Sequence, residues 1–209
     1  MNKVCPNKDV RLLILRKYLS KLDRYILFYA LGIRKKYLSY TFTRDAALIG
    51  NLKVLQWLRG NGFHWNSYTC SYAASKGHLE VLKWARENGC PWDDFTCSSA
   101  AFNGHLEVLQ WARANECHWN EFVCSNAAKN GHLKVLIWAR ENGCPWDSNT
   151  CAYAAQNGHL EVLQWLRKKG CPWDEWTCSY AAFNGHLEVL RWARENDCPW
   201  DSFTCSYAA

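Results

Sequence analysis

One stretch decides the fold: CSSAAFNGHLEVLQWARANECHWNEFV at residues 97–123, which returns as CSYAAFNGHLEVLRWARENDCPWDSFT at residues 178–204. Glycine, tryptophan and cysteine each recur with the same period of 27 residues. The glycines that show it are Gly50, Gly77, Gly104, Gly131, Gly158 and Gly185. Five full units run from Cys70 to Thr204, after a more divergent unit from Thr43 to Thr69. A fixed period of this length is typical of proteins built from stacked units.

Each unit carries the signals of two short helices. The pattern predicts one first helix at about residues 95–102, with Asp93 or Asp94 as its N-terminal cap. Asn103 and Gly104 follow it, and both residue types tolerate the positive φ that ends a helix. A second helix is predicted at about residues 106–114, since its apolar residues form one broad stripe. The stripe consists of Leu106, Val108, Leu109, Trp111 and Ala112.

Two such helices cannot bury both of their apolar faces alone, so stacking of neighbouring units has to supply the core. The small Ala-Ala pairs let adjacent helices approach closely, and the repeated tryptophan fills the space between layers. A leucine-rich repeat is the competing architecture, because its period also includes 27 residues and Leu106-x-x-Leu109-x-Trp111 imitates its motif. However, Asn115 comes one residue late for that motif, and the Ala-Ala helix has no counterpart in it.

The repeated string AAxxGHLEVLxWxRxxG resembles the second half of an ankyrin repeat, as at Ala73-Ala74, Gly77-His78 and Leu79 to Leu82. An ankyrin unit has about 33 residues, and the missing residues fall where its β-hairpin would be. GHLEVLKWARENGCPWD (77–93) is similar to the compact ankyrin units that are expanded in giant DNA viruses. The resemblance implies an all-α, ankyrin-like solenoid of stacked helix pairs with shortened hairpin loops. It also implies a viral protein that binds host proteins.

In ankyrin proteins the concave side, formed by the hairpin tips and the first helices, recognises the partner. At the matching positions of this chain the residues vary between units while the frame does not, and several are aromatic, as suits a protein-binding face. Packing of the aromatics under the next loop, and helix capping by the asparagines, remain the structural alternatives. The predicted partner-binding residues are Ser75, Lys76, Phe95, Phe102, Asn103, Phe122, Lys129, Asn130, Asn149, Gln156, Asn157, Trp176, Phe183 and Asn184, with Phe203 at the register of Phe95.

Twelve cysteines and seven histidines raise the possibility of a metal site, but no close C-x₂-C pair is present. Because thiols such as Cys90 and Cys97 recur with the repeat, they are interpreted as small buried core residues. His78 and His105 follow a glycine at a helix entry, where the ring can bond to the backbone. No catalytic motif is present, and Glu107 recurs as Glu80, Glu161 and Glu188, as a solvated helix face does. We therefore expect no enzyme, no cofactor, no metal and no small-molecule substrate.

Residues 1–42 form a separate N-terminal segment before the array at residues 43–209. Residues 1–44 hold eleven Lys and Arg against two Asp, a net charge of +9, whereas the rest has fourteen basic and seventeen acidic residues, a net charge of −3. Pro6, Asp9, Leu15 and Tyr18-Leu19 loosely resemble an F-box, which would dock residues 6–40 onto the adaptor subunit of a cullin-type ubiquitin ligase. The spacing between Leu15 and Tyr18-Leu19 is one residue longer than in an F-box, and the usual Cys-x-x-Trp end is absent. A helical cap on the first repeat and contact with an anionic surface are the other interpretations.

The basic charge lies outside the array, which disfavours nucleic acid as a partner of the repeats. The longest apolar run, Tyr25 to Ile33, is too short for a membrane span and lacks a cleavage site for a signal peptide. We therefore expect a cytoplasmic protein, in the host cell if it is viral, with reduced cysteines. The array stops within a seventh unit at residues 205–209, without a polar closing repeat. Such an end is expected to fray, to self-associate or to reflect a shortened chain.

Overall fold

The computed structural model describes residues 39–207, in which helices alternate with short loops and no strand occurs. Each unit contributes a first and a second helix. The first helices are α3 (Ser39–Ile49), α5 (Ser67–Ser75), α7 (Asp94–Phe102), α9 (Glu121–Lys129), α11 (Ser148–Gln156), α13 (Glu175–Phe183) and α15 (Ser202–Tyr207). The second helices are α4 (Leu52–Gly60), α6 (Leu79–Glu87), α8 (Leu106–Ala114), α10 (Leu133–Glu141), α12 (Leu160–Lys168) and α14 (Leu187–Glu195). The all-α solenoid of stacked helix pairs is confirmed.

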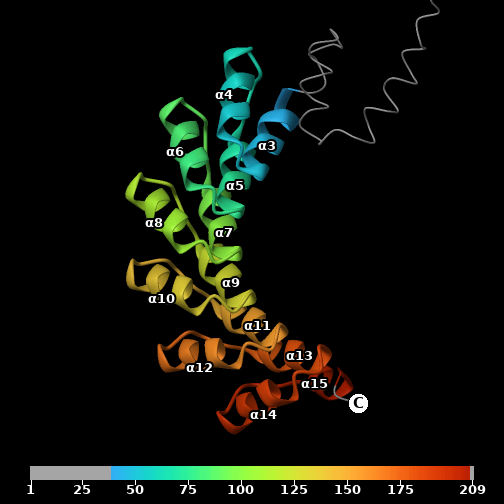
Figure 1. The fold of residues 1–209 in the computed structure, drawn as a ribbon. Coiled ribbons are helices and arrows are strands. Elements are labelled where there is room, and N and C mark those ends of the chain that lie inside the picture. The colour runs from blue at the N-terminus through green and yellow to red at the C-terminus, as the bar shows by residue number, and fades with distance from the viewer. Residues whose placement is uncertain (1–38, 208–209) are drawn as a thin grey trace, which may run out of the picture.

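The helix pairs stack into an arc with the first helices along its inner, concave side and the second helices radiating outward (Figure 1). Neighbouring first helices pack against each other much more extensively than neighbouring second helices do. The reason lies in side-chain size. The Ala-Ala pairs of the first helices, such as Ala100 and Ala101, are completely buried, whereas the second helices bring bulky tryptophans to their contacts. Close inner and splayed outer helices make the array curve.

The boundaries of helices α7 and α8 agree with the sequence prediction. Helix α8 spans Leu106–Ala114 and buries Val108, Leu109 and Ala112. Helix α7 begins at Asp94, one residue before the predicted start, with Asp93 as its N-terminal cap residue. None of the helices described between residues 39 and 207 combines the length and apolar character that a membrane span requires.

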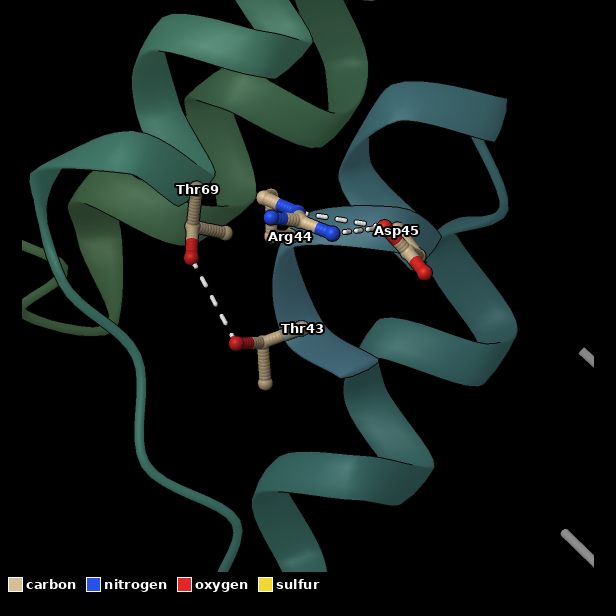
Figure 2. A network of polar contacts seen from close by, with 4 residues as sticks. All are labelled: Thr43, Arg44, Asp45 and Thr69. Atoms are coloured by element: carbon tan, nitrogen blue, oxygen red, sulfur yellow. Dashed lines mark hydrogen bonds and ion pairs between the residues drawn. The ribbon is translucent and has the colours of Figure 1, made fainter. Parts of the chain in front are cut away.

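The divergent first unit joins the array through polar as well as apolar contacts. Figure 2 shows that the hydroxyl of Thr69 in α5 donates a hydrogen bond to the hydroxyl of Thr43 in α3, over 3.5 Å. The neighbouring Arg44 forms an ion pair with Asp45 at 3.0 Å. Thr43 stands where the later units carry a cysteine, such as Cys70. The first unit therefore follows the same stacking geometry with a different core chemistry.

Candidate protein-binding surface

A ladder of histidines joins each unit to the one before it. From α6 to α14, the Nε2 atom of the histidine that precedes the second helix lies 3.0–3.3 Å from a backbone carbonyl oxygen 30 residues earlier. The rings also cover the glycines of the preceding unit: a Cβ on Gly104 would come within 2.8 Å of the His132 ring. Burial lowers the pKa of His105 and His159, although the bond to the carbonyl opposes it. The histidines therefore contact the backbone, as the sequence indicated.

A second ladder fixes the loop that follows each second helix. The guanidinium of Arg113 lies over the ring of Trp119, 4.2 Å from its centroid, and donates a hydrogen bond to the carbonyl of Cys117. Every unit repeats this arrangement, from Arg59 over Trp65 to Arg194 over Trp200. The loop tryptophan then meets the helix tryptophan of the next unit edge to face, as Trp119 and Trp138 do at 5.8 Å. The expected filling of the space between layers is thus made by tryptophan pairs.

The cysteines that the structure describes lie inside the array as free thiols. Ten are described, and all are buried. The relevant spacing is 20 residues, not the seven that separate Cys90 from Cys97, since the Cys97 thiol lies against Cys117 and donates weakly to its carbonyl. The hydrogen bond with Cys117 and burial raise the pKa of Cys97, so this thiol stays protonated and unreactive. Among residues 39–207 no group of three or more potential ligand side chains could hold a metal ion.

The predicted aromatic residues lie at both ends of the first helices and are exposed. At the N-terminal ends, Phe95, Phe122 and Trp176 are 63%, 53% and 48% exposed. At the C-terminal ends, Phe102 and Phe183 are 41% and 65% exposed. Asn149 is also exposed, and the side chain of Phe203 lies outside the described part of the chain. Full packing of these rings under the next loop would bury them, whereas about half of each ring is exposed.

The structure brings three of these aromatic residues together around one cavity. The α7–α9 hollow is a cavity of about 390 Å³ lined by Asp94, Phe95, Ser98, Ser99, Phe102, Asn103, Phe122 and Asn126. A second cavity of about 280 Å³ lies beside it, lined by Tyr68, Ser71, Tyr72, Ser75, Phe95 and Ser99. The two share Phe95 and Ser99, so they form one groove across α5, α7 and α9. Trp176 and Phe183 lie apart from this groove, on α13.

The predicted polar residues have more local roles. The asparagines at the C-terminal ends of the first helices cap them, because each side-chain amide donates to the carbonyl four residues earlier. They are Asn103, Asn130, Asn157 and Asn184. Ser75 donates to the carbonyl of Tyr72, and the Lys129 ammonium lies 5.4 Å from the centroid of the Tyr153 ring. Lys76 is exposed, while the Gln156 side-chain oxygen is buried without a hydrogen-bond partner in the described chain.

Sequence reasoning missed the position directly before each Ala-Ala pair. Three first helices carry half-buried tyrosines there, Tyr72, Tyr153 and Tyr180, while α7 and α9 carry Ser99 and Asn126. It also missed Tyr68, 58% exposed, which lies 27 residues before Phe95. The signal was present in the sequence, since the position directly before the Ala-Ala pair carries a large ring in some units and a smaller side chain in others. Its meaning depends on which side of the helix faces the cavity.

Comparison with known proteins agrees with this geometry. A family model described as ankyrin repeats in many copies matches residues 70–113 and 151–194. Among solved structures, the human ASB11 ankyrin repeat domain is similar, with a TM-score of 0.57 and 16% sequence identity over 80% of this chain and 83% of that chain. At that identity the likeness concerns the fold alone. No curated protein matches the sequence significantly. Ankyrin repeat domains are typically binding modules without enzymatic activity. With their stacked helix pairs and this family match, the segments at residues 70–113 and 151–194 are ankyrin repeats.

Proposed function

We propose that this protein is an interaction scaffold that binds another protein through its concave face. The observation that carries the proposal is the set of exposed aromatic side chains on the first helices, among them Phe95, Phe122 and Phe183 at 53–65% exposure. Large exposed apolar groups that gather on one face mark interaction sites, and aromatic residues contribute strongly to the binding energy of protein interfaces.

The contrast between the repeated contact residues and the variable positions of the concave face supports this function. Arginine and tryptophan recur at their registers in every unit, and histidine does so in every unit after the first, because they fix the loops and join neighbouring units. By contrast, the register of Ser75 continues as Phe102, Lys129, Gln156 and Phe183. The fold does not require one residue type at this position. The half-buried or exposed side chains there are available to a partner. Variation of this kind gives each unit its own contact chemistry.

A variant with Phe102, Phe122, Trp176 and Phe183 all changed to Ala tests the proposal. Because each aromatic anchor contributes on the order of 1 kcal/mol or more to an interface, capture of partner proteins should fall at least tenfold. Helicity measured by circular dichroism should stay the same. The matched control changes four exposed glutamates of the second helices, one per unit, to Ala: Glu80, Glu107, Glu161 and Glu188. Equal capture by wild type and the aromatic variant would contradict the assignment.

The alternative function is recruitment of a target to a cullin-type ubiquitin ligase through an F-box-like segment at residues 6–40. It rests on the sequence of a segment that lies almost entirely before the described residues, and so does the expected boundary of the N-terminal segment at residue 42. In the full chain, changing Leu15 and Leu19 to Asp should abolish capture of adaptor and cullin subunits while capture of the target persists. A wild-type chain that captures no such subunits would end this alternative. The viral origin likewise stays a prediction.

A further inference from the structure

The α7–α9 hollow exists because two units depart from the pattern of the array. Where α5, α11 and α13 place Tyr72, Tyr153 and Tyr180, the helices α7 and α9 place Ser99 and Asn126, and both of these line the hollow. A phenol ring at either position would occupy space that is now empty. At this register of the concave wall, three first helices therefore carry a tyrosine, and the adjacent helices α7 and α9 carry smaller side chains.

The walls of the hollow combine apolar rings with polar groups that lack partners. Phe95, Phe102 and Phe122 all line it and are all more than 40% exposed. Within residues 39–207, the hydroxyl of Ser99 and the carboxamide of Asn126 make no hydrogen bond. A ligand that buries an apolar group among the rings would find hydrogen-bond donors and acceptors in the lining of the hollow. The volume of about 390 Å³ falls in the range of about 300–1,000 Å³ that is typical of ligand pockets.

The edge of the hollow at the helix N-termini is acidic. Asp94 directly precedes Phe95, and Glu121 directly precedes Phe122. The Asp94 carboxylate accepts one hydrogen bond, from Asn120, and neither loop 90–96 nor loop 117–123 contains Lys or Arg. Asp94 and Phe95 both line the hollow, and Glu121 precedes Phe122 at the start of α9. A cationic side chain gains from both groups, since it pairs with the carboxylate and stacks on the ring face.

We propose that the α7–α9 hollow binds a linear segment of a partner protein that presents one large apolar side chain flanked by Lys or Arg. This inference rests on the proposed function of the concave face. The apolar side chain enters between the phenylalanines and contacts Ser99 and Asn126. The flanking cations lie against Asp94 with Phe95 and against Glu121 with Phe122. The second cavity, which shares Phe95 and Ser99 with the hollow, extends the groove toward α5, and an elongated groove suits a chain segment.

The test uses the full chain to select binders from a displayed library of random 12-residue peptides. The selected peptides should carry a large apolar residue next to Lys or Arg. Their affinity is then measured by fluorescence anisotropy for wild type and for the double variant Ser99→Tyr/Asn126→Tyr. This variant installs the residue that other first helices already carry, so the array should fold, as checked by circular dichroism and thermal unfolding. Filling the hollow should weaken binding at least tenfold.

A second variant tests the charge of the occupant. Asp94→Asn/Glu121→Gln keeps the shape of the hollow and should weaken the same peptides by about three- to tenfold at low salt, as expected for exposed ion pairs and cation–π contacts. Raising the salt concentration should reduce the difference between wild type and variant, because salt screens the pairs. Selection of acidic or uncharged peptides that enter the hollow would overturn the assigned partner chemistry.

The remaining outcomes separate this inference from the proposed function. Peptides that bind Ser99→Tyr/Asn126→Tyr as tightly as wild type, but lose affinity for the quadruple Ala variant of the aromatic residues, overturn the hollow and leave the concave face as the binding surface. Peptides that neither variant affects overturn both. A synthetic peptide of residues 8–24 that binds in trans, and loses affinity when the hollow is filled, would assign the hollow to this chain's own basic N-terminal segment and overturn an external partner.

Discussion

The contacts between units and the concave face of the same units follow opposite rules. At the contacts, the same residues make the same interactions in each unit, such as His132 with the carbonyl of Phe102 and His159 with that of Lys129. On the concave face, equivalent positions hold Tyr72, Ser99, Asn126 and Tyr153. The first region joins neighbours 24–30 residues apart, while side chains of the second, such as Asn126 and Phe183, stand partly or largely in solvent.

The difference separates the residues that stabilise the fold from those that determine binding specificity. In a repeat array the stability is approximately a sum of unit and nearest-neighbour terms, so each contact between units matters locally and has to be renewed in every unit. The concave face carries no such requirement, and it can change one unit at a time. Substitutions at contacts should therefore change unfolding, and substitutions on the concave face should change binding.

The largest effect is expected for Gly104→Ala, which breaks a contact between units. Gly104 has φ of +77°, and a Cβ there would lie 2.8 Å from the His132 ring. The backbone strain costs about 1–2 kcal/mol and the crowding about 1–3 kcal/mol, so we expect a loss of about 3 kcal/mol in urea unfolding. Gly185→Ala is the matched control: φ is +73°, but no described atom lies near the new Cβ. It should lose only about 1 kcal/mol. Equal losses would show that the histidine contact is unimportant.

A smaller loss, about 2 kcal/mol, is expected for Arg113→Ala. The substitution removes the cation–π contact with Trp119 and the hydrogen bond to the carbonyl of Cys117, which together contribute about that amount. Arg113→Lys should recover only part of it, because an ammonium cannot lie flat on the indole. The comparison is Phe95→Ala on the concave face, which should stay within about 0.5 kcal/mol of wild type. Urea unfolding followed by tryptophan fluorescence measures all three. A larger loss for Phe95→Ala than for Arg113→Ala would reverse the distinction.

A gain of about 1 kcal/mol is expected for Glu116→Gly. Glu116 has φ of +66°, at the position where other units carry Gly89 and Gly143. A side chain in the left-handed region costs about 1 kcal/mol, and the glycine removes it. Since Glu116 is exposed, the substitution breaks no packing. Thermal unfolding should shift upward, and a downward shift would mean that the Glu116 side chain makes a stabilising contact. Peptide binding should not change.

The smallest effect is a dependence of stability on pH through the histidine ladder. Burial lowers the pKa of His105 and His159 below the value of about 6.5 in the unfolded chain. The unfolded state therefore binds more protons below that pH, and the stability present at pH 7 should decline as the pH falls below about 6.5. The double variant His105→Asn/His159→Asn, which copies Asn51 of the first unit, should show a flatter profile between pH 7 and pH 5. An unchanged profile would exclude these rings as its cause.

Most of the fold could be predicted from the sequence because the repeat supplies its own internal comparison. The period, the two helices per unit and the ankyrin likeness follow from residues such as Gly104, His105 and Ala100-Ala101. The pairing of Cys97 with Cys117 could not be predicted from the spacing of seven between Cys90 and Cys97. It depends on how the chain returns after the second helix, and a linear spacing does not contain that path.

The candidate site was predictable only in part. The exposed aromatics at Phe95, Phe102 and Phe122 follow from the registers that vary between units. The capping role of Asn103 and its equivalents was foreseen as an alternative, and the structure supports it. The hollow itself was not foreseen. Ser99 and Asn126 become significant only when their neighbours Tyr72 and Tyr153 are seen to fill the same wall.

By itself, the sequence determined that this protein is an array of 27-residue helix pairs in which glycine, histidine, arginine and tryptophan recur as contact residues. These features are local and periodic, so one chain displays them several times. Only the tertiary structure decided that the missing tyrosines at residues 99 and 126 open a cavity, and that Asp94 and Phe95 stand at its edge. A cavity depends on which side chains meet across two helices, and that meeting is set by curvature and packing, which no single unit encodes.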